Sequence, residues 1–161
     1  MKFKKILVPV DGSEPALRAL DTACDFMRDH EELQLRVITI VPAPPIAPDV
    51  KFIRRPKKTK TPVALMDTDD YAEVVLQVIE DGYDSLQEMV GPSISEFGDR
   101  AKIDVAANIA PADGIVEYAH DHGCDLVIMG KSGRGKVKDF LLGSVSIGVL
   151  RNSRNAVLTV K

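Results

Sequence analysis

Cysteine is scarce in this chain, and long hydrophobic runs are missing. The 161 residues include two cysteines, Cys24 and Cys124, without paired spacing, which argues against a disulfide scaffold and favours a reducing compartment. Basic residues precede the apolar run ILVPV near the N-terminus, but that run is too short for a signal-peptide core. No run approaches the roughly 18 apolar residues that a membrane span needs. We therefore expect a cytoplasmic protein without a membrane segment.

An excess of positive charge is also missing. Lys and Arg number 21 against 24 Asp and Glu, which gives a formal net charge of −3 and a pI of about 5.6. The global field therefore does not favour nucleic acid as a partner. Apolar residues make up 45% of the chain and charged residues 28%, as in an ordinary soluble globular protein. The length predicts one domain spanning residues 1–161.

Short apolar runs alternate with amphipathic segments along the chain. The apolar runs predict strands over 5–10, 33–41, 101–109, 124–130 and 156–160. Apolar residues at helical spacing predict helices from Ser13, as N-cap, through Met27, over 69–90, over 111–122 and from Ser144 through Leu150. Gly91-Pro92 is expected to end or kink the second of these helices. Strands apolar on both faces and alternating with helices indicate a parallel sheet in a three-layer α/β sandwich.

A proline-rich, basic segment interrupts this alternation at about 42–65. Its six prolines exclude a continuous helix or a central strand, so we predict a long surface loop. Basic residues crowd its second half: Lys51, Arg54, Arg55, Lys57, Lys58 and Lys60. Two interpretations stay open, a solvated loop or a partner-binding segment over 49–60. Phe52 is the only aromatic residue there, so stacking of nucleic-acid bases is not suggested.

The stretch GKSGRGKVKDFLLGSVS, residues 130–146, nearly matches the phosphate loop G-x-x-x-x-G-K-[ST]. Val137 lacks the hydroxyl that coordinates Mg²⁺ in that loop, so a different arrangement fits better. Gly130 and Gly133 allow the backbone to approach a ligand closely. Gly143-Ser144 then opens a helix, whose free N–H groups and dipole favour an anion such as phosphate.

Two polar stretches, VPVDGSE and IMGKSGRG, follow the first and the fourth predicted strands. Open parallel sheets bind ligands beyond the carboxyl ends of their strands, where the strand order reverses. If these strands are neighbours, the two stretches face one crevice. Asp11 in the first stretch is either a ligand contact or a turn aspartate. Basic residues in and after the second stretch either neutralise phosphates or are merely solvated: Lys131, Arg134, Lys136 and Lys138.

Together these motifs resemble the nucleotide-binding branch of the universal stress protein (UspA-type) family. The family signature G-x2-G-x9-G-[ST] is matched by Gly130, Gly133, Gly143 and Ser144 with both gaps correct. VPVDGS on the first strand and AVLTV at the end of the chain complete the resemblance, which covers all but residues 42–65. It implies a five-stranded parallel sheet in the order 3-2-1-4-5, Rossmann-like and similar to the adenine-nucleotide α-hydrolases. It also implies ATP as the cofactor, with Mg²⁺ or Mn²⁺ as its metal.

The resemblance further implies roles for particular residues. The adenosine end is expected to contact Pro9, Val10 and Asp11, with Ile40 lining the adenine pocket and Met129 and Gly130 near the ribose. The phosphates are expected to be held, largely through backbone N–H groups and two hydroxyls, by Gly133, Gly143, Ser144, Val145 and Ser146. Two departures, Ile109 where many relatives have Gly and Ala156 where many have Pro, concern local shape more than nucleotide binding.

Relatives in this family form homodimers through the last strand, and the same is expected here for residues 156–160. An apolar strand at the edge of a sheet favours such pairing.

Catalytic residue sets do not emerge from the sequence. No Ser-His-Asp set, carboxylate pair or metal-ligand cluster is apparent, and His120 and His122 point to different faces of a helix. The resemblance implies an ATP-binding stress-response protein that acts as a nucleotide-dependent switch or adaptor, with slow ATP hydrolysis left open. An adenylating enzyme of the α-hydrolase type would carry S-G-G-x-D-S where this chain has DGSE. A partner-binding module that uses residues 49–60 is the third hypothesis.

Overall fold

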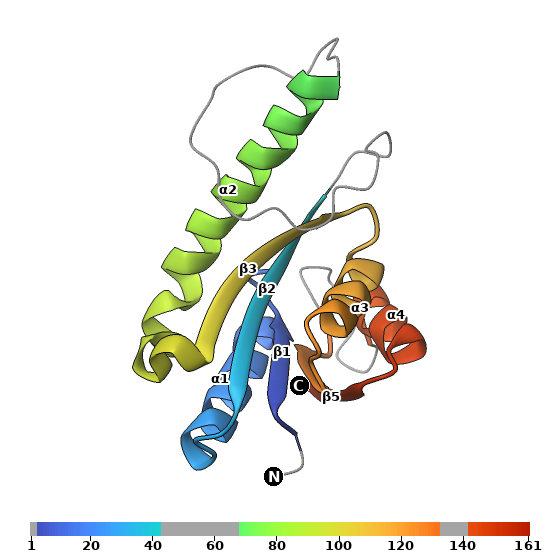
Figure 1. The fold of residues 1–161 in the computed structure, drawn as a ribbon. Helices are drawn as coiled ribbons and strands as arrows, with labels where there is room; N and C mark the ends of the chain where they lie inside the picture. The colour runs from blue at the N-terminus through green and yellow to red at the C-terminus, as the bar shows by residue number, and fades with distance from the viewer. Residues whose placement is uncertain (1–2, 43–67, 133–141) are drawn as a thin grey trace.

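The computed structural model describes residues 3–42, 68–132 and 142–161. Five strands form one parallel sheet: β1 (Lys5–Pro9), β2 (Gln34–Pro42), β3 (Ala101–Asn108), β4 (Leu126–Gly130) and β5 (Ala156–Val160). They lie in the order β3-β2-β1-β4-β5 (Figure 1), which confirms the predicted order and places β5 at an edge. The largest error in a predicted strand boundary is at β4, which begins two residues later than expected.

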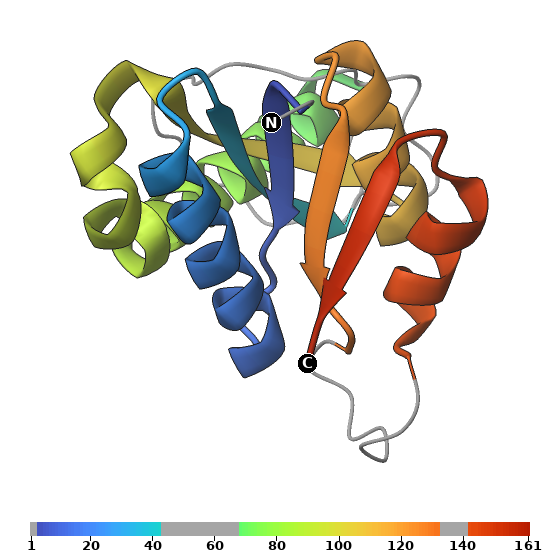
Figure 2. The same cartoon turned by 90° about the horizontal axis from the view of Figure 1, so that it is seen from below.

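Helices of the described ranges cover both faces of the sheet. One face carries α1 (Glu14–Asp29), α2 (Thr68–Ile94) and the short 3-10 helix η1 (Ser95–Arg100), and the other carries α3 (Pro111–Asp121) and α4 (Ser144–Asn152) (Figure 2). This arrangement confirms the predicted three-layer α/β sandwich. None of the helices described in these ranges is both long and apolar enough to cross a membrane.

The inner strands carry the core. Ile6 and Val8 of β1 pack with α1, whereas Leu7 between them packs with α3, and all three side chains are fully buried. Every residue of β4 is buried as well. Because successive side chains of a strand point to opposite faces, a strand covered on both sides must be apolar throughout.

The start of α1 follows the predicted capping pattern. Ser13 is the N-cap, and its hydroxyl oxygen accepts a hydrogen bond from the Ala16 N–H at 3.4 Å. Pro15 lies in the first turn, where its missing N–H costs little. Cys24 and Cys124 are both buried and unpaired, and they pack in the two core clusters on opposite faces of the sheet.

Gly91-Pro92 does not end α2. The helix continues through this pair to Ile94, so a helix end at Val90 is wrong. Val90 and Ile94 are buried in the same core as α1, and a proline so close to the end of a helix removes only one backbone hydrogen bond. Burial of these two side chains therefore outweighs the local breaking signal.

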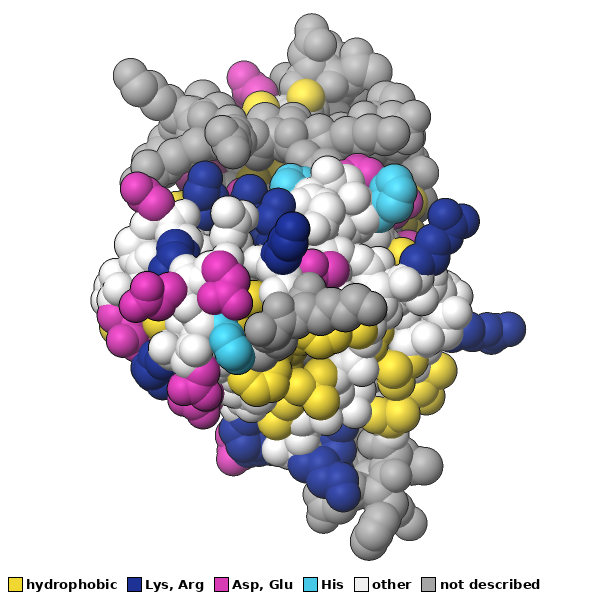
Figure 3. All heavy atoms as spheres, turned by 60° about the horizontal axis from the view of Figure 1, so that its bottom comes forward, with side chains coloured by type: hydrophobic (Ala, Val, Ile, Leu, Met, Phe, Trp, Pro, Cys, Tyr) yellow, Lys and Arg dark blue, Asp and Glu magenta, His cyan; other side chains and the backbone are white. Residues whose placement is uncertain are grey.

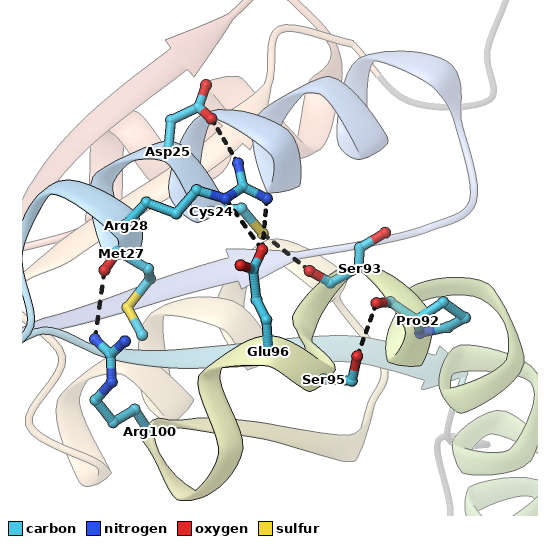
Figure 4. A network of polar contacts seen from close by, with 9 residues as sticks. All are labelled: Cys24, Asp25, Met27, Arg28, Pro92, Ser93, Ser95, Glu96 and Arg100. Carbon is cyan, nitrogen blue, oxygen red and sulfur yellow. Dashed lines mark hydrogen bonds and ion pairs between the residues drawn. The ribbon is translucent and has the colours of Figure 1, made fainter.

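Polar contacts fasten η1 to the end of α1 (Figure 4). The Arg28 guanidinium donates to the Glu96 carboxylate at 2.6 and 3.0 Å and pairs with Asp25 at 2.8 Å. Arg100 donates to the carbonyl oxygen of Met27 at 3.4 Å. The last carbonyls of a helix have no intrahelical donor, so Arg100 closes the end of α1.

The start of α4 differs from the prediction by one residue. Gly143, not Ser144, is the N-cap: its backbone is extended, and its carbonyl accepts the N–H of Ile147 at 2.9 Å. Gly143 is fixed there because its own N–H donates to the Lys131 carbonyl at 2.8 Å. The predicted loop at 42–65 lies outside the described residues from residue 43 onward.

Candidate functional site

A pocket of about 280 Å³ lies beyond the carboxyl ends of β1, β2 and β4, between the first turns of α1, α3 and α4. β1 and β4 are neighbours in the sheet, so the strand order reverses at this place. The crevice expected from the two polar stretches is therefore present. Its volume is close to the lower end of the range for small-molecule sites.

Ten of the eleven residues assigned by resemblance line this pocket. They are Pro9, Val10, Asp11, Ile40, Met129, Gly130, Gly143, Ser144, Val145 and Ser146. The eleventh, Gly133, lies outside the described residues, as do Arg134, Lys136, Lys138 and the basic segment 49–60. The structure thus brings together residues that lie up to about 140 positions apart in the sequence.

Part of the lining was not predicted from the sequence. Ile38 and Thr39 come from β2, Pro111 and Ile115 from the first turns of α3, and Ser13, Ala16 and Ser132 complete the set. The helix that follows β3 begins over the same end of the sheet as the pocket, and this topological rule is the signal that could have found Pro111 and Ile115.

One wall of the pocket is apolar. Val10, Ile115 and Met129 are each at most 4% exposed, and the half-buried Ile40 packs in the same cluster as Ile115 and Met129. Such a wall suits a flat, weakly polar group. Asp11 is the only residue with an ionisable side chain among the described lining residues.

The opposite wall is the N-terminus of α4. The backbone N–H groups of Ser144, Val145 and Ser146 belong to the first turn of the helix, where no intrahelical acceptor exists. With the positive end of the helix dipole, they form a site for an anion. The Gly143 N–H differs from the expectation, because it already donates to the Lys131 carbonyl.

Ser146 connects this wall to the sheet. It is 2% exposed, and its hydroxyl donates to the carbonyl oxygen of Gly130 at 2.9 Å. The hydroxyl hydrogen expected to reach a phosphate is thus already engaged. Ser146 holds the start of α4 against the end of β4, so it positions the N–H groups of the pocket.

Gly130 is required for a reason that the sequence did not reveal. A Cβ atom on Gly130 would lie 2.6 Å from the carbonyl carbon of Pro15 and 2.8 Å from its oxygen. The missing side chain therefore allows the end of β4 to pack directly against the first turn of α1. This packing is a role for Gly130 in addition to the predicted close approach of a ligand.

Asp11 fits both interpretations that the sequence left open. Its carboxylate accepts the N–H of Ser13 at 3.0 Å, as in a turn, while the residue also lines the pocket. Gly12 between them has φ 81°, a conformation that favours glycine. Asp11 thus shapes the turn from β1 into α1 and still presents an acceptor to the pocket, suited to hydroxyl or amino donors rather than to phosphate.

His120, in the last turn of α3, and His122, its C-cap, are absent from the pocket lining. His122 stacks on Tyr118 with ring centroids 3.8 Å apart, and His120 pairs with the adjacent Asp121 at 3.1 Å. Among the described residues, no group of three His, Cys, Asp or Glu side chains could hold a metal ion.

A family model and individual relatives of this chain point to the same protein family. A family model described as "Universal stress protein family" matches residues 2–161. The chain is 28% identical over 160 residues to universal stress protein MJ0531 of Methanocaldococcus jannaschii, covering 99% of this chain and 82% of that protein. It is 27% identical over 165 residues to universal stress protein MJ0577 of the same organism, covering 99% and 95%.

Solved structures of universal stress proteins have a similar fold. The structure of MJ0577 superposes with a TM-score of 0.73 at 25% identity, covering 100% of this chain and 97% of that one. A universal stress protein in complex with cAMP gives 0.66 at 22% identity, covering 100% and 99%. One from Archaeoglobus fulgidus in complex with dAMP gives 0.59 at 18%, covering 100% of both chains.

Proposed function

Because the chain belongs to the universal stress protein family, we propose that it binds ATP in the pocket beyond β1, β2 and β4. One observation carries the proposal: a single cavity joins an apolar wall to the N-terminus of α4. The apolar wall suits a purine, and the free N–H groups suit phosphate. The cAMP and dAMP complexes of the structural neighbours support an adenine nucleotide as the ligand.

In this proposal each wall binds one end of the nucleotide. The adenosine lies against Pro9, Val10 and Ile40, with the Asp11 carboxylate as an acceptor for hydroxyl or amino groups. The ribose lies near Met129 and Gly130. The phosphates accept hydrogen bonds from the backbone of residues 144–146, and Gly133 approaches them as the family signature implies. Mg²⁺ or Mn²⁺ binds with the phosphates.

The proposed role is that of a nucleotide-dependent switch or adaptor in the cytoplasm. ATP joins β4, α1 and α4 around one ligand, so occupancy stabilises the pocket end of the molecule. At a concentration a hundredfold above the Kd, ATP should stabilise the fold by about 2.7 kcal/mol, which raises the Tm by about 5–10 °C. Mass spectrometry of nucleotide released from the denatured protein would identify the natural occupant.

Ser144→Asp tests the phosphate position. Ser144 is exposed and is the first residue of α4. A carboxylate there complements the helix dipole and raises stability by about 0.5 kcal/mol, but it repels a phosphate group. We expect calorimetry to show at least a tenfold loss of ATP affinity, about 1.4 kcal/mol, together with an unchanged or higher Tm without nucleotide.

Ser144→Asn is the matched control, since it has nearly the same shape without the charge. Its ATP affinity should stay within about threefold of the original. Equal affinities of the Asp and Asn variants would place the phosphates elsewhere. Absence of any thermal shift with millimolar ATP and Mg²⁺ would remove the proposal altogether.

We also propose a homodimer through β5. This strand lies at the edge of the sheet. Three large apolar side chains are exposed there: Leu158 of β5 (36%), and Ile147 (50%) and Leu150 (42%) of the neighbouring α4. Figure 3 shows hydrophobic side chains gathered in the lower half of the face that it views. Light scattering at micromolar concentration should give twice the chain mass of 17.6 kDa. The Leu158→Glu variant should give the mass of a single chain. A monomeric original protein would refute the dimer.

A further inference from the structure

A second and larger hollow, of about 910 Å³, runs along the outer edge of β3. In Figure 1, β3 lies between β2 and α2. Five consecutive residues of the strand, 101–105, line this groove. Successive side chains of a strand point to opposite faces, so a groove that touches five in a row must straddle the edge itself. The groove shares no lining residue with the nucleotide pocket.

The side of the groove towards α2 is apolar along β3, and its polar lining side chains are Glu80, Gln87 and Ser95. Ile79 and Ile94 of α2 line it and are at most 6% exposed, and Ile103 of β3 packs in the core on the same side. Tyr83 adds an aromatic ring to this wall. An apolar side chain inserted here would extend an existing hydrophobic cluster.

The side of the groove towards α3 is charged. The Arg36 guanidinium donates to the Asp104 carboxylate at 2.7 Å, and the Tyr118 hydroxyl donates to the same carboxylate oxygen. Burial and this carboxylate both raise the pKa of Tyr118, so the phenol stays neutral. Lys102 is exposed in the same wall and forms no ion pair with any of the described residues. The remaining charge of this wall is therefore positive.

The edge of the strand carries hydrogen-bonding groups. Within the described ranges, β3 pairs with β2 alone. An edge strand directs a row of backbone N–H and C=O groups away from its neighbour. Residues 101–105 line the groove, so the outward groups among them face it, although the Ala101 N–H already donates to the Gly98 carbonyl. Five residues of strand span about 17 Å, enough for a short extended peptide.

We propose that this groove binds an extended segment of a partner protein by strand addition to β3. The segment alternates apolar with acidic residues: its apolar side chains lie against Ile79 and Ile103, and its carboxylates lie near Lys102. The alternation follows from the geometry, because the two walls differ in polarity and a strand presents its side chains to them in turn.

The test uses the full-length protein and a blocked octapeptide that alternates valine with glutamate. Amide exchange followed by NMR should show protection at alternate residues of 101–105 when the peptide is added. The same peptide, methylated at the N–H groups that would face β3, has equal charge and the same side chains but cannot form the ladder, and it should not bind. A peptide that alternates valine with lysine should bind at least about fivefold more weakly.

Lys102→Glu reverses the charge at one exposed position of the groove and should weaken binding of the glutamate peptide by about fivefold. Arg154→Glu makes the same charge change at an exposed residue beyond α4 and should leave the affinity within about twofold. The proposal is overturned if the methylated peptide binds as well as the unmodified one, or if no amide in 101–105 becomes protected. Concentration-dependent protection of these amides without peptide would identify a second copy of the chain as the occupant and also overturn it.

Discussion

The two ends of the parallel sheet use their backbone groups differently. At the amino end, the Asp125 carboxylate accepts the N–H groups of Lys4 and Lys5 at 2.9 and 3.1 Å, and the Lys5 ammonium donates to the His122 carbonyl at 2.8 Å. At the carboxyl end, by contrast, the first N–H groups of α4 are left without an acceptor in their own helix and line a pocket. One end is closed by side chains, and the other is open to a ligand.

This difference separates stability from recognition. Side chains that satisfy backbone groups lower the free energy of the native state whether or not a ligand is present. Backbone groups that remain free gain hydrogen bonds only when a ligand arrives, so they contribute to affinity. Substitutions at the amino end should thus change unfolding and leave ATP binding alone, whereas the packing that shapes the pocket should affect both.

Gly130→Ala should have the largest effect. The added Cβ would overlap backbone atoms of Pro15 at 2.6–2.8 Å, and backbone cannot move aside as a flexible side chain can. We expect a loss of about 3 kcal/mol in urea unfolding. Gly123→Ala, just after α3, is the control: nothing lies within 4 Å of the new Cβ, and only its φ of 61° is strained, at about 1 kcal/mol. Equal losses would show that steric overlap at Gly130 is not the reason for the glycine.

Ser146→Ala should cause the second-largest loss of stability. The variant leaves the buried Gly130 carbonyl without the hydroxyl that now donates to it, which costs about 2 kcal/mol of unfolding free energy. ATP affinity should fall as well, because α4 loses its connection to β4. Ser144→Ala, at an exposed position two residues away, should change stability by less than about 0.5 kcal/mol. A Ser146 variant as stable as the original would contradict the positioning role.

Asp125→Ala tests the amino end. It removes the acceptor of two backbone N–H groups and should lower the unfolding free energy by about 1.5 kcal/mol. ATP affinity, measured by calorimetry, should not change. Asp25→Ala removes an ion pair whose partners are 50% and 70% exposed and should cost at most about 0.5 kcal/mol. If Asp125→Ala weakened ATP binding tenfold, the two ends would not be independent.

Sequence alone predicted the parts of this molecule that depend on local patterns. Apolar runs gave the strands, Ser13 predicted the start of α1, and the glycine signature carried the resemblance from which the strand order followed. It failed where tertiary packing decides. Burial of Val90 and Ile94 carries α2 through Gly91-Pro92, and no local pattern encodes that burial.

The site likewise combines features that local sequence patterns predict with features that depend on tertiary packing. The pocket-lining residues identified from the sequence and its family resemblance lie at the carboxyl ends of β1, β2 and β4 or at the start of α4, whereas Pro111 and Ile115 line the pocket because α3 begins over the same end of the sheet. The close packing of Gly130 on Pro15 and the bond from Gly143 to Lys131 are contacts between distant segments. Spacing reveals neither of them, because they depend on how helices sit on the sheet.

Alkaline pH should lower the free energy of unfolding through the two buried cysteines. Burial raises the pKa of both Cys24 and Cys124 to about 11, from an ordinary 9.0. The unfolded chain therefore loses these protons first as pH rises, so their contribution to stability is complete below about pH 9 and declines between pH 9 and 11. At pH 10 each thiol should lower the unfolding free energy by about 1 kcal/mol, as measured by urea unfolding at pH 8, 9 and 10. Replacing both cysteines with alanine should flatten this part of the pH profile, and an unchanged slope would show that other groups cause it.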